Sequence, residues 1–327
     1  MVYSMVIRCI DQQFLLKPDH NPKQPLISAG CHVDCLDSRN DLIPEPSVIN
    51  IIGAAAARAQ KLSPIHIHWV EANINHLTIG FSVDADQIQN ISDFFRNLHS
   101  YIAVKLNVKW ERDGHLWGAP YRPTPCTDDV SASQQLIYCM TNPAKDGLVE
   151  KVGDSPFMTT YPALAQGKRL RFWRIDWDGY HHAGGARKKS HRIKDYLEWL
   201  ELELTPLPEQ EGWPEHKRRS WVRAQVRDVE NETRERLKAE GRSAMGAAAQ
   251  FRVDPRDRPK NPKKSGPQPL CHASSPEARR EYKRRWREVL REHRAASIDY
   301  LLGYFEREFP EGTFRPPITK PYQSSRL

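Results

Sequence analysis

The stretch HIHWVEANINHLTIGF, residues 66 to 81, contains three residues that could bind a metal. His66, His68 and His76 lie on or beside two short apolar runs that join at an Asn-containing turn. Imidazole nitrogens are common metal ligands in proteins. The stretch is therefore a metal-binding strand pair, the remains of one, or a plain β-hairpin.

A second set of reactive side chains lies in DDVSASQQLIYCMTNPAKDGLV. Asp128 or Asp129 can cap a helix, which we expect to run to about Thr141 and to end at Pro143. Tyr138 and Asn142 are four residues apart, so they share one face of this helix. A tyrosine hydroxyl is a weak nucleophile because its ordinary pKa is about 10, and it needs a nearby cation to attack a phosphate.

Several periodic segments would position these residues. SMVIRCI predicts a strand, PSVINIIGAAAARAQKL a helix, IHIHWVEA and HLTIGFSV an antiparallel hairpin, and residues 84–110 an amphipathic helix. This order predicts an α+β fold with an antiparallel sheet and helices on one face.

Four features of residues 3–150 together resemble the single-tyrosine HUH transposases, most closely the REP-associated tyrosine transposase group. They are VEANINHLTI, LWGAPYR, YCMTNPAKDGLV, and the order and separation of these motifs. The later FEREFPEGTFRPP is similar to the C-terminal end of long relatives. The resemblance implies an HUH-transposase-like fold of the ferredoxin or RRM type.

The resemblance also implies roles for individual residues. Tyr138 takes the place of the catalytic nucleophile, which would form a covalent 5′-phosphotyrosine and leave a free 3′-hydroxyl. His76 and Asn142 take the places of two ligands of Mg²⁺ or Mn²⁺. Ile74 occupies the place of the first metal histidine, so the motif is broken and the metal is expected to bind weakly or not at all. His68 and Glu71 are the candidates for a substitute ligand.

Charge is unevenly distributed along the 327 residues, whose net charge is +8. Residues 1–150 contain 12 basic and 16 acidic side chains, and the remaining residues contain 37 and 25. Clustered Lys and Arg favour a nucleic-acid partner, although a solvated helical surface has the same composition. The expected DNA-binding residues are Arg122, Arg169, Arg171, Arg187, Lys188 and Lys189.

The same changes in composition predict three regions. We expect a transposase-like domain over residues 1–150, a basic mixed segment over 151–214, and a mainly helical basic region over 215–327 with a Pro/Lys-rich linker near 252–270. Val222, Val226, Val229 and Leu237 would line the buried face of a long charged helix in the last region.

The cysteines favour a reducing compartment. Six are scattered without a disulfide-like framework. GCHVDC could be half a zinc site, but no second Cys/His pair stands at zinc-finger spacing, so Cys31 and Cys35 are expected to be free thiols in a loop. With no signal peptide and no apolar run of membrane-spanning length, we expect a cytoplasmic protein without a membrane partner.

Two functions from different classes follow. One is a metal-assisted DNA strand transferase that cuts single-stranded or hairpin DNA through Tyr138. The other is a domesticated hairpin-DNA-binding protein that has lost cleavage together with the histidine at position 74. Relatives include monomers and dimers, so a homodimer remains open.

Overall fold

The structure is a computed structural model that describes residues 1–19, 31–36, 42–187, 192–260 and 269–317. Its strands and longer helices are, in chain order, β1 (Tyr3–Arg8), β2 (Cys31–Leu36), β3 (Leu42–Pro46), α1 (Val48–Leu62), β4 (His66–Asn73), β5 (His76–Ser82), α2 (Asn90–Lys109), β6 (Arg122–Pro125), α3 (Asp129–Lys145), α4 (Tyr161–Gln166), β7 (Leu170–Ile175), α5 (Trp177–His182), β8 (Leu197–Leu202), α6 (Glu215–Ala239), α7 (Ala247–Phe251) and α8 (Pro276–Leu301).

A four-stranded sheet with the order β4-β5-β1-β6 forms the centre of the molecule, and all its pairs are antiparallel. Because side chains alternate between the two faces of a strand, Met5 and Ile7 join the core beneath α1 and α2, while Ser4 and Arg8 face the other way. The expected α+β class with an antiparallel sheet is confirmed.

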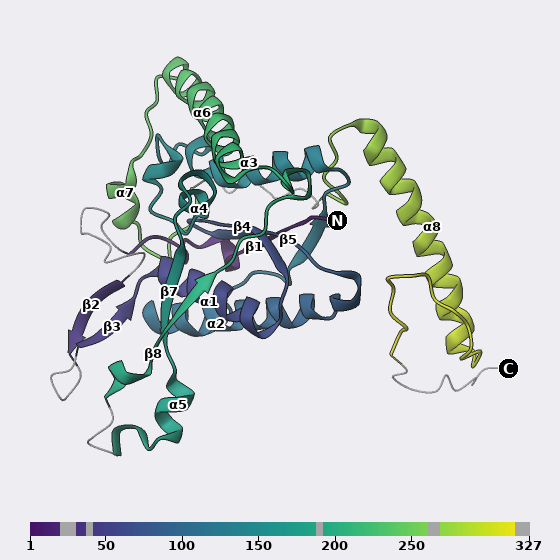
Figure 1. Cartoon of the computed structure of the whole chain (residues 1–327), viewed down its shortest axis with the longest axis horizontal. Helices are drawn as coiled ribbons and strands as arrows, with labels where there is room; N and C mark the ends of the chain where they lie inside the picture. Colours follow the sequence, from purple (N-terminus) through teal and green to yellow (C-terminus); the bar gives the residue numbers. More distant parts are fainter. Residues whose placement is uncertain (20–30, 37–41, 188–191, 261–268, 318–327) are drawn as a thin grey trace.

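The helices cover both faces of the sheet. α1 and α2 lie on one face, as expected, but α3 lies on the other with α6 packed against it (Figure 1). A second apolar core explains this difference, because Trp69 of β4 and the α3 residues Leu136 and Met140 are buried together with Val222 of α6. A sheet with apolar side chains on both faces must be covered on both.

Local sequence explains the elements that carry the candidate site. The side chain of Ser47 caps α1 by accepting a hydrogen bond from the backbone N–H of Asn50, and an Ala-rich run follows. The β4–β5 hairpin turns at Ile74 and Asn75, so Asn73 pairs directly with His76.

Residues beyond 150 pack into the same cores. The ring of Phe172 on β7 lies against α1 where Gly53 leaves room for it, and the side chain of Asn50 exchanges two hydrogen bonds with the backbone of Trp173. The β7–β8 hairpin therefore completes the core beneath α1. The expected boundary at residue 150 stays a prediction.

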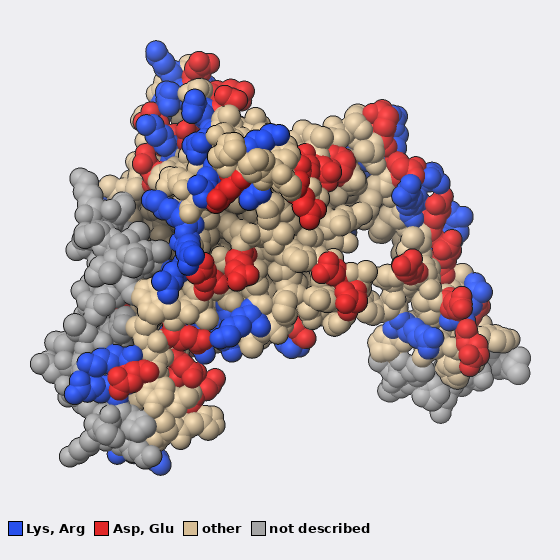
Figure 2. All heavy atoms as spheres, in the orientation of Figure 1, with Lys and Arg blue, Asp and Glu red and all other residues tan. Residues whose placement is uncertain are grey.

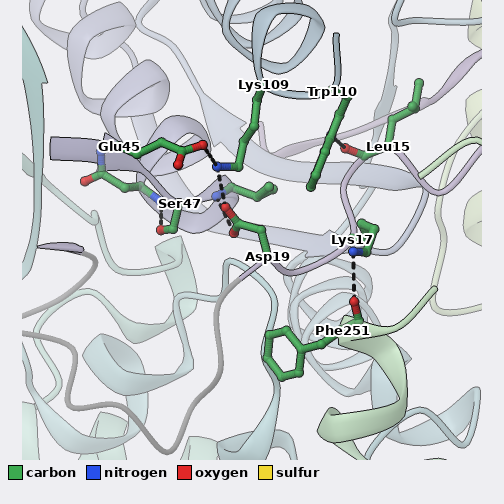
Figure 3. A network of polar contacts seen from close by, with 10 residues as sticks. Leu15, Lys17, Asp19, Glu45, Ser47, Lys109, Trp110 and Phe251 are labelled. Atoms are coloured by element: carbon green, nitrogen blue, oxygen red, sulfur yellow. Dashed lines mark hydrogen bonds and ion pairs between the residues drawn. The ribbon is translucent and has the colours of Figure 1, made fainter. Parts of the chain in front are cut away.

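A polar network ties the N-terminal segment to the end of α2 (Figure 3). The ammonium group of Lys109 lies 2.7 Å from a carboxylate oxygen of Asp19 and 2.8 Å from one of Glu45. Nearby, the indole of Trp110 donates to the carbonyl of Leu15 at 3.0 Å, and Lys17 donates to the carbonyl of Phe251 on α7 at 3.0 Å. Residues 15–19 thus connect α2 to the C-terminal half.

The C-terminal region is mainly helical, as expected. Val222, Val226 and Leu237 are buried along α6 and Val229 is partly buried, which confirms the expected face of that helix. α8 extends away from the sheet and its helices, and basic and acidic side chains alternate over both α6 and α8 (Figures 1 and 2). No helix in the described residues has the length and apolar character needed to cross a membrane.

Candidate nucleic-acid site on the α3 face

A polar row crosses one end of the sheet beneath α3. Asn73 on β4 is in register with His76 on β5, and His76 is in register with Arg8 on β1. Directly paired residues of antiparallel strands point to the same face, so all three side chains share the α3 side of the sheet. In the next row on this face Glu71 and Thr78 are buried and Val6 is half-buried, whereas Arg8 is exposed.

α3 crosses this row and contacts it through two polar side chains. The amide nitrogen of Asn142 lies 3.0 Å from Nε2 of His76, and the amide of Asn73 donates to Asp146 at 3.2 Å. The helix begins with a capping box, in which Asp128 accepts from the backbone of Ser131. Both predicted metal ligands therefore meet in one place.

The predicted end of α3 at Pro143 was wrong. The helix continues to Lys145, because a proline in the last turn removes only one intrahelical hydrogen bond. The chain then turns through Gly147, whose φ of 71° suits glycine, and the backbone N–H of Leu148 donates to the carbonyl of Pro143. This extra turn positions Lys145 and Asp146 beside the site.

Tyr138 lies one helical turn before Asn142, and half of its side chain is exposed. The ammonium group of Lys145 is 5.0 Å from the centre of its ring, within the range of a cation–π contact. Burial of the inner half raises the pKa of the phenol, and the nearby Cys139 and Asp146 raise it further, while Arg8 opposes them. The hydroxyl is therefore protonated at neutral pH.

An open hollow of about 580 Å³ adjoins Tyr138 between α3 and α6. Its lining includes Lys145 and Gln134 of α3 and Trp221 and Gln225 of α6. Aromatic rings beside amide and ammonium groups suit an unstacked base with its phosphate.

The tautomer of His76 is fixed by a chain of hydrogen bonds. The amide nitrogen of Asn75 donates to the carbonyl of Gln12 at 3.2 Å, so its amide oxygen accepts from Nδ1 of His76 at 3.0 Å. Nε2 then carries the lone pair that accepts from Asn142. Burial lowers the pKa of His76 to about 4, and the charge of Arg8 adds to the effect, so the ring is neutral at pH 7.

The residues present do not fit a divalent cation well. His76 and Asn142 supply two neutral donors, and the nearby carboxylate of Asp146 accepts from the amide of Asn73. The described residues hold no group of three His, Cys, Asp or Glu that could bind a metal. Ile74 packs against the apolar core that includes the residues beneath α1 and α2, and it offers no lone pair. Mg²⁺ prefers hard oxygen ligands, above all carboxylates.

Neither expected substitute ligand is available. Both nitrogens of His68 are engaged, with the carbonyl of Thr205 at 2.9 Å and the hydroxyl of Ser82 at 3.0 Å. Glu71 is buried and accepts from the backbone N–H and the hydroxyl of Thr160, at 3.0 and 2.6 Å. Burial raises the pKa of Glu71 to about 7.

The predicted DNA-binding residues lie apart from one another. Arg122 on β6 pairs with Val6, two residues before Arg8, and therefore shares the α3 face. Arg169 faces Glu201 at 3.8 Å, and Arg171 lies over the ring of Trp199. Arg187 ends a short 3-10 turn after α5. Lys188 and Lys189 fall outside the described residues.

Within the part of the chain that is described, no hydrogen bond or ion pair joins Arg169, Arg171 or Arg187 to the polar row or to Tyr138. Cys9, Cys126, Cys139 and Cys271 are buried free thiols. The loop expected around Cys31 and Cys35 is wrong, because both residues lie on strand β2, and their side chains are outside the description.

Arg8, Lys145 and Asp146 belong to the site but were not found from the sequence. Arg8 ends the apolar strand SMVIR, and its place beside His76 depends on the β1–β5 register. The only sequence feature that could have pointed to Arg8 is its position as a charged residue at the end of an apolar strand. Lys145 and Asp146 were missed because the helix was expected to stop at Pro143.

Comparison with known proteins leaves the family open. No family model matches the chain, and no curated protein matches it. A similar solved structure is described as "Structure of the REP associates tyrosine transposase bound to a REP hairpin". It is 12% identical, covers 50% of this chain and 79% of that chain, and has a TM-score of 0.32. A likeness at this level says nothing about the function of this chain.

Proposed function

We propose that this chain binds single-stranded or hairpin DNA through the α3 face of its sheet and has lost efficient strand cleavage. One observation carries the proposal. Asn142 on α3 donates to His76 on β5 at 3.0 Å, and Tyr138 is half exposed one turn earlier. These are the residues to which the transposase-like motif assigns the site.

Loss of cleavage follows from the chemistry of the donors. A protonated phenol attacks a phosphate poorly, and the surroundings of Tyr138 raise its pKa instead of lowering it. The expected Mg²⁺ or Mn²⁺ would find two neutral donors here, so we derive no step through a metal.

DNA binding is supported by positive charge outside the site. Five cations of α8 form no ion pair with any described residue and follow one another at spacings of three or four residues, so they form a stripe along the helix. They are Arg279, Lys283, Arg287, Arg291 and Arg294. Lys and Arg side chains in such a stripe neutralise successive phosphates.

Strand transfer is the second candidate function. The half-exposed side chain of Tyr138 favours it, because a merely structural tyrosine on an amphipathic helix would face the core. In this reaction the Tyr138 oxygen forms a bond to a DNA phosphorus and the bond from that phosphorus to the 3′-oxygen breaks. The phenol loses its proton and the departing 3′-oxygen gains one, which leaves a 5′-phosphotyrosine and a free 3′-hydroxyl.

A paired binding and cleavage experiment separates these functions. Labelled hairpin DNA, single-stranded DNA and blunt duplex are titrated with the full chain, and the same mixtures with Mg²⁺ or Mn²⁺ are run on a denaturing gel. We expect tighter binding to the hairpin or single strand than to the duplex, and no covalent adduct. Tyr138→Phe removes one hydroxyl and should weaken hairpin binding without abolishing it.

Equal affinity for all three DNA forms would contradict specific binding. A strong adduct in the unchanged protein that Tyr138→Phe abolishes would establish the strand transferase instead. Neither the cytoplasmic location nor a homodimer is addressed by this experiment, and both remain predictions.

A further inference from the structure

Arg8 differs from the other two members of the polar row because its charged group has no ion-pair partner among the described residues. Asn73 is engaged by Asp146 and His76 by Asn142. The guanidinium of Arg8 is exposed and forms no ion pair with any residue that the structure describes. A charged group held in register on a rigid strand, with no counter-ion, is well placed to receive an anion.

The surroundings of Arg8 favour an anion over a metal ion. The same two donors that a metal would use, His76 and Asn142, are already hydrogen-bonded to each other. A fixed positive charge on the adjacent strand also repels a divalent cation from Nε2 of His76. Lys145, 5.0 Å from the Tyr138 ring, adds a second cation on the helix side.

Electrostatic coupling connects Arg8 to both functional side chains. Its charge lowers the pKa of His76 after the larger effect of burial, and it counteracts the burial and acidic neighbours that raise the pKa of Tyr138. The geometry agrees with this coupling, because Arg8 pairs with His76 across the β1–β5 register and Tyr138 lies on α3 one turn before Asn142, which contacts the same imidazole. Arg8 and His76 therefore share the end of β1 with the helix that carries Tyr138.

We propose that Arg8 binds a DNA backbone phosphate at this position without a metal ion, taking the place that a bound cation would have. The guanidinium presents a planar fork of N–H donors that matches two phosphate oxygens. The protonated hydroxyl of Tyr138 donates to the same phosphate, and Lys145 contributes charge. No bond is made or broken. This inference rests on the proposed DNA-binding function and assigns its phosphate anchor.

Fluorescence anisotropy with labelled hairpin DNA tests the anchor. The full chain, Arg8→Gln, Arg8→Lys and the matched control Arg96→Gln are compared in EDTA and in Mg²⁺. Arg96 lies on α2, exposed and paired with Asp93, on the opposite side of the sheet. We expect EDTA to leave the affinity of the unchanged protein within about twofold.

Arg8→Gln should weaken binding about tenfold, as expected for one lost charge-assisted phosphate contact, and reduce the salt slope by about one. Arg8→Lys should lose less, because it keeps the charge but not the fork, and Arg96→Gln should bind normally. Hairpins carrying one uncharged methylphosphonate linkage at successive positions identify the phosphate. One linkage should weaken binding to the unchanged protein and have no further effect on Arg8→Gln.

Each outcome has a separate meaning. If the unchanged chain does not bind hairpin DNA, the proposed function fails. If it binds and Arg8→Gln binds equally well, or if EDTA abolishes binding, only the anchor is wrong. If circular dichroism shows that Arg8→Gln does not fold, Arg8→Lys is the deciding variant. Equal affinity of Arg8→Lys and the unchanged chain, with the same response to each methylphosphonate linkage, would overturn the role of the guanidinium fork.

Discussion

At the scale of single residues, the site is defined by a neutral histidine beside a positive charge. Hydrogen bonds from Gln12 through Asn75 fix Nδ1 of His76 as the protonated nitrogen and leave Nε2 for Asn142. Such second-shell support is typical of metal-binding histidines. Here it holds His76 as the acceptor for Asn142, and Ile74 beside it offers no lone pair that could complete a set of metal ligands.

The pKa of His76 tests this arrangement. Burial and Arg8 lower it to about 4, so Arg8→Gln should raise it toward the ordinary value by removing the second cause. NMR titration of the imidazole nitrogens measures the change, and their chemical shifts at pH 7 report whether Nε2 is unprotonated. Arg96→Gln is the control and should leave the titration unchanged. A pKa of His76 that does not respond to Arg8→Gln would contradict their proximity.

At the scale of elements, the packing of α1 against the β7–β8 hairpin connects two regions that the composition separates. A methyl group added at Gly53 would lie 2.3 Å from the ring of Phe172, which is closer than atoms can pack. The hairpin therefore approaches α1 only because residue 53 is glycine. This contact contributes to the core that supports the sheet from the face opposite α3.

A pair of substitutions measures this contact. Gly53→Ala should destabilise the chain, because overpacking costs about 1–3 kcal/mol and outweighs the gain of about 1 kcal/mol for alanine in a helix. In a Phe172→Leu background the clash is relieved, so the same change should become neutral or stabilising. Urea denaturation of the four proteins gives the values. An equal cost in both backgrounds would show that α1 and Phe172 are not in contact.

At the scale of the whole molecule, buried titratable groups set the response to acid. Burial is the first cause that lowers the pKa of His68, His76 and His99 to about 4 and raises that of Glu71 to about 7. Between pH 6.5 and 4.5 the unfolded chain protonates the three histidines while the folded chain does not. Glu71 has the opposite effect on the stability, because the folded chain keeps the carboxyl proton that the unfolded chain loses.

Three histidines outweigh one glutamate, so stability should fall as the pH is lowered through this window. Near pH 5.5 the unfolded state holds more protons, and the slope should be about 2 kcal/mol per pH unit. Urea denaturation at pH 7, 6 and 5 measures it. His68→Gln should make the slope shallower, and a stability that rises on acidification would refute this balance.

The charge of the C-terminal helix acts at the same scale, because α8 extends away from the body of the molecule (Figure 1). Replacing the five cations of its stripe, which pair with no described residue, by Gln should weaken DNA binding and reduce the salt slope by at least about two. Neutralising Arg280, Arg284 and Arg285 is the matched control. These arginines pair with Glu277, Glu281 and Glu288 on the same helix, so the effect should be smaller. Equal slopes for the two variants would argue against the stripe.

Local patterns determined much of this protein. Alternation and helical periodicity were sufficient for β1, the β4–β5 hairpin, α1, α2 and most of α3, because each depends on neighbours within a few residues. The four-residue spacing of Tyr138 and Asn142 follows from helix geometry alone. The motif resemblance also predicts that Ile74 takes the place of a metal histidine, and this assignment stays a prediction.

Only the tertiary structure decided which side chains meet. The register of β1 against β5 placed Arg8 beside His76, and the crossing of α3 over the sheet brought Asn142 to the same imidazole. The second core decided that helices cover both faces, and Gly53 with Phe172 joined the hairpin beyond residue 150 to the first core. These contacts join residues far apart in the chain, and their free energy comes from shared burial and pairing, which no local window of the sequence contains.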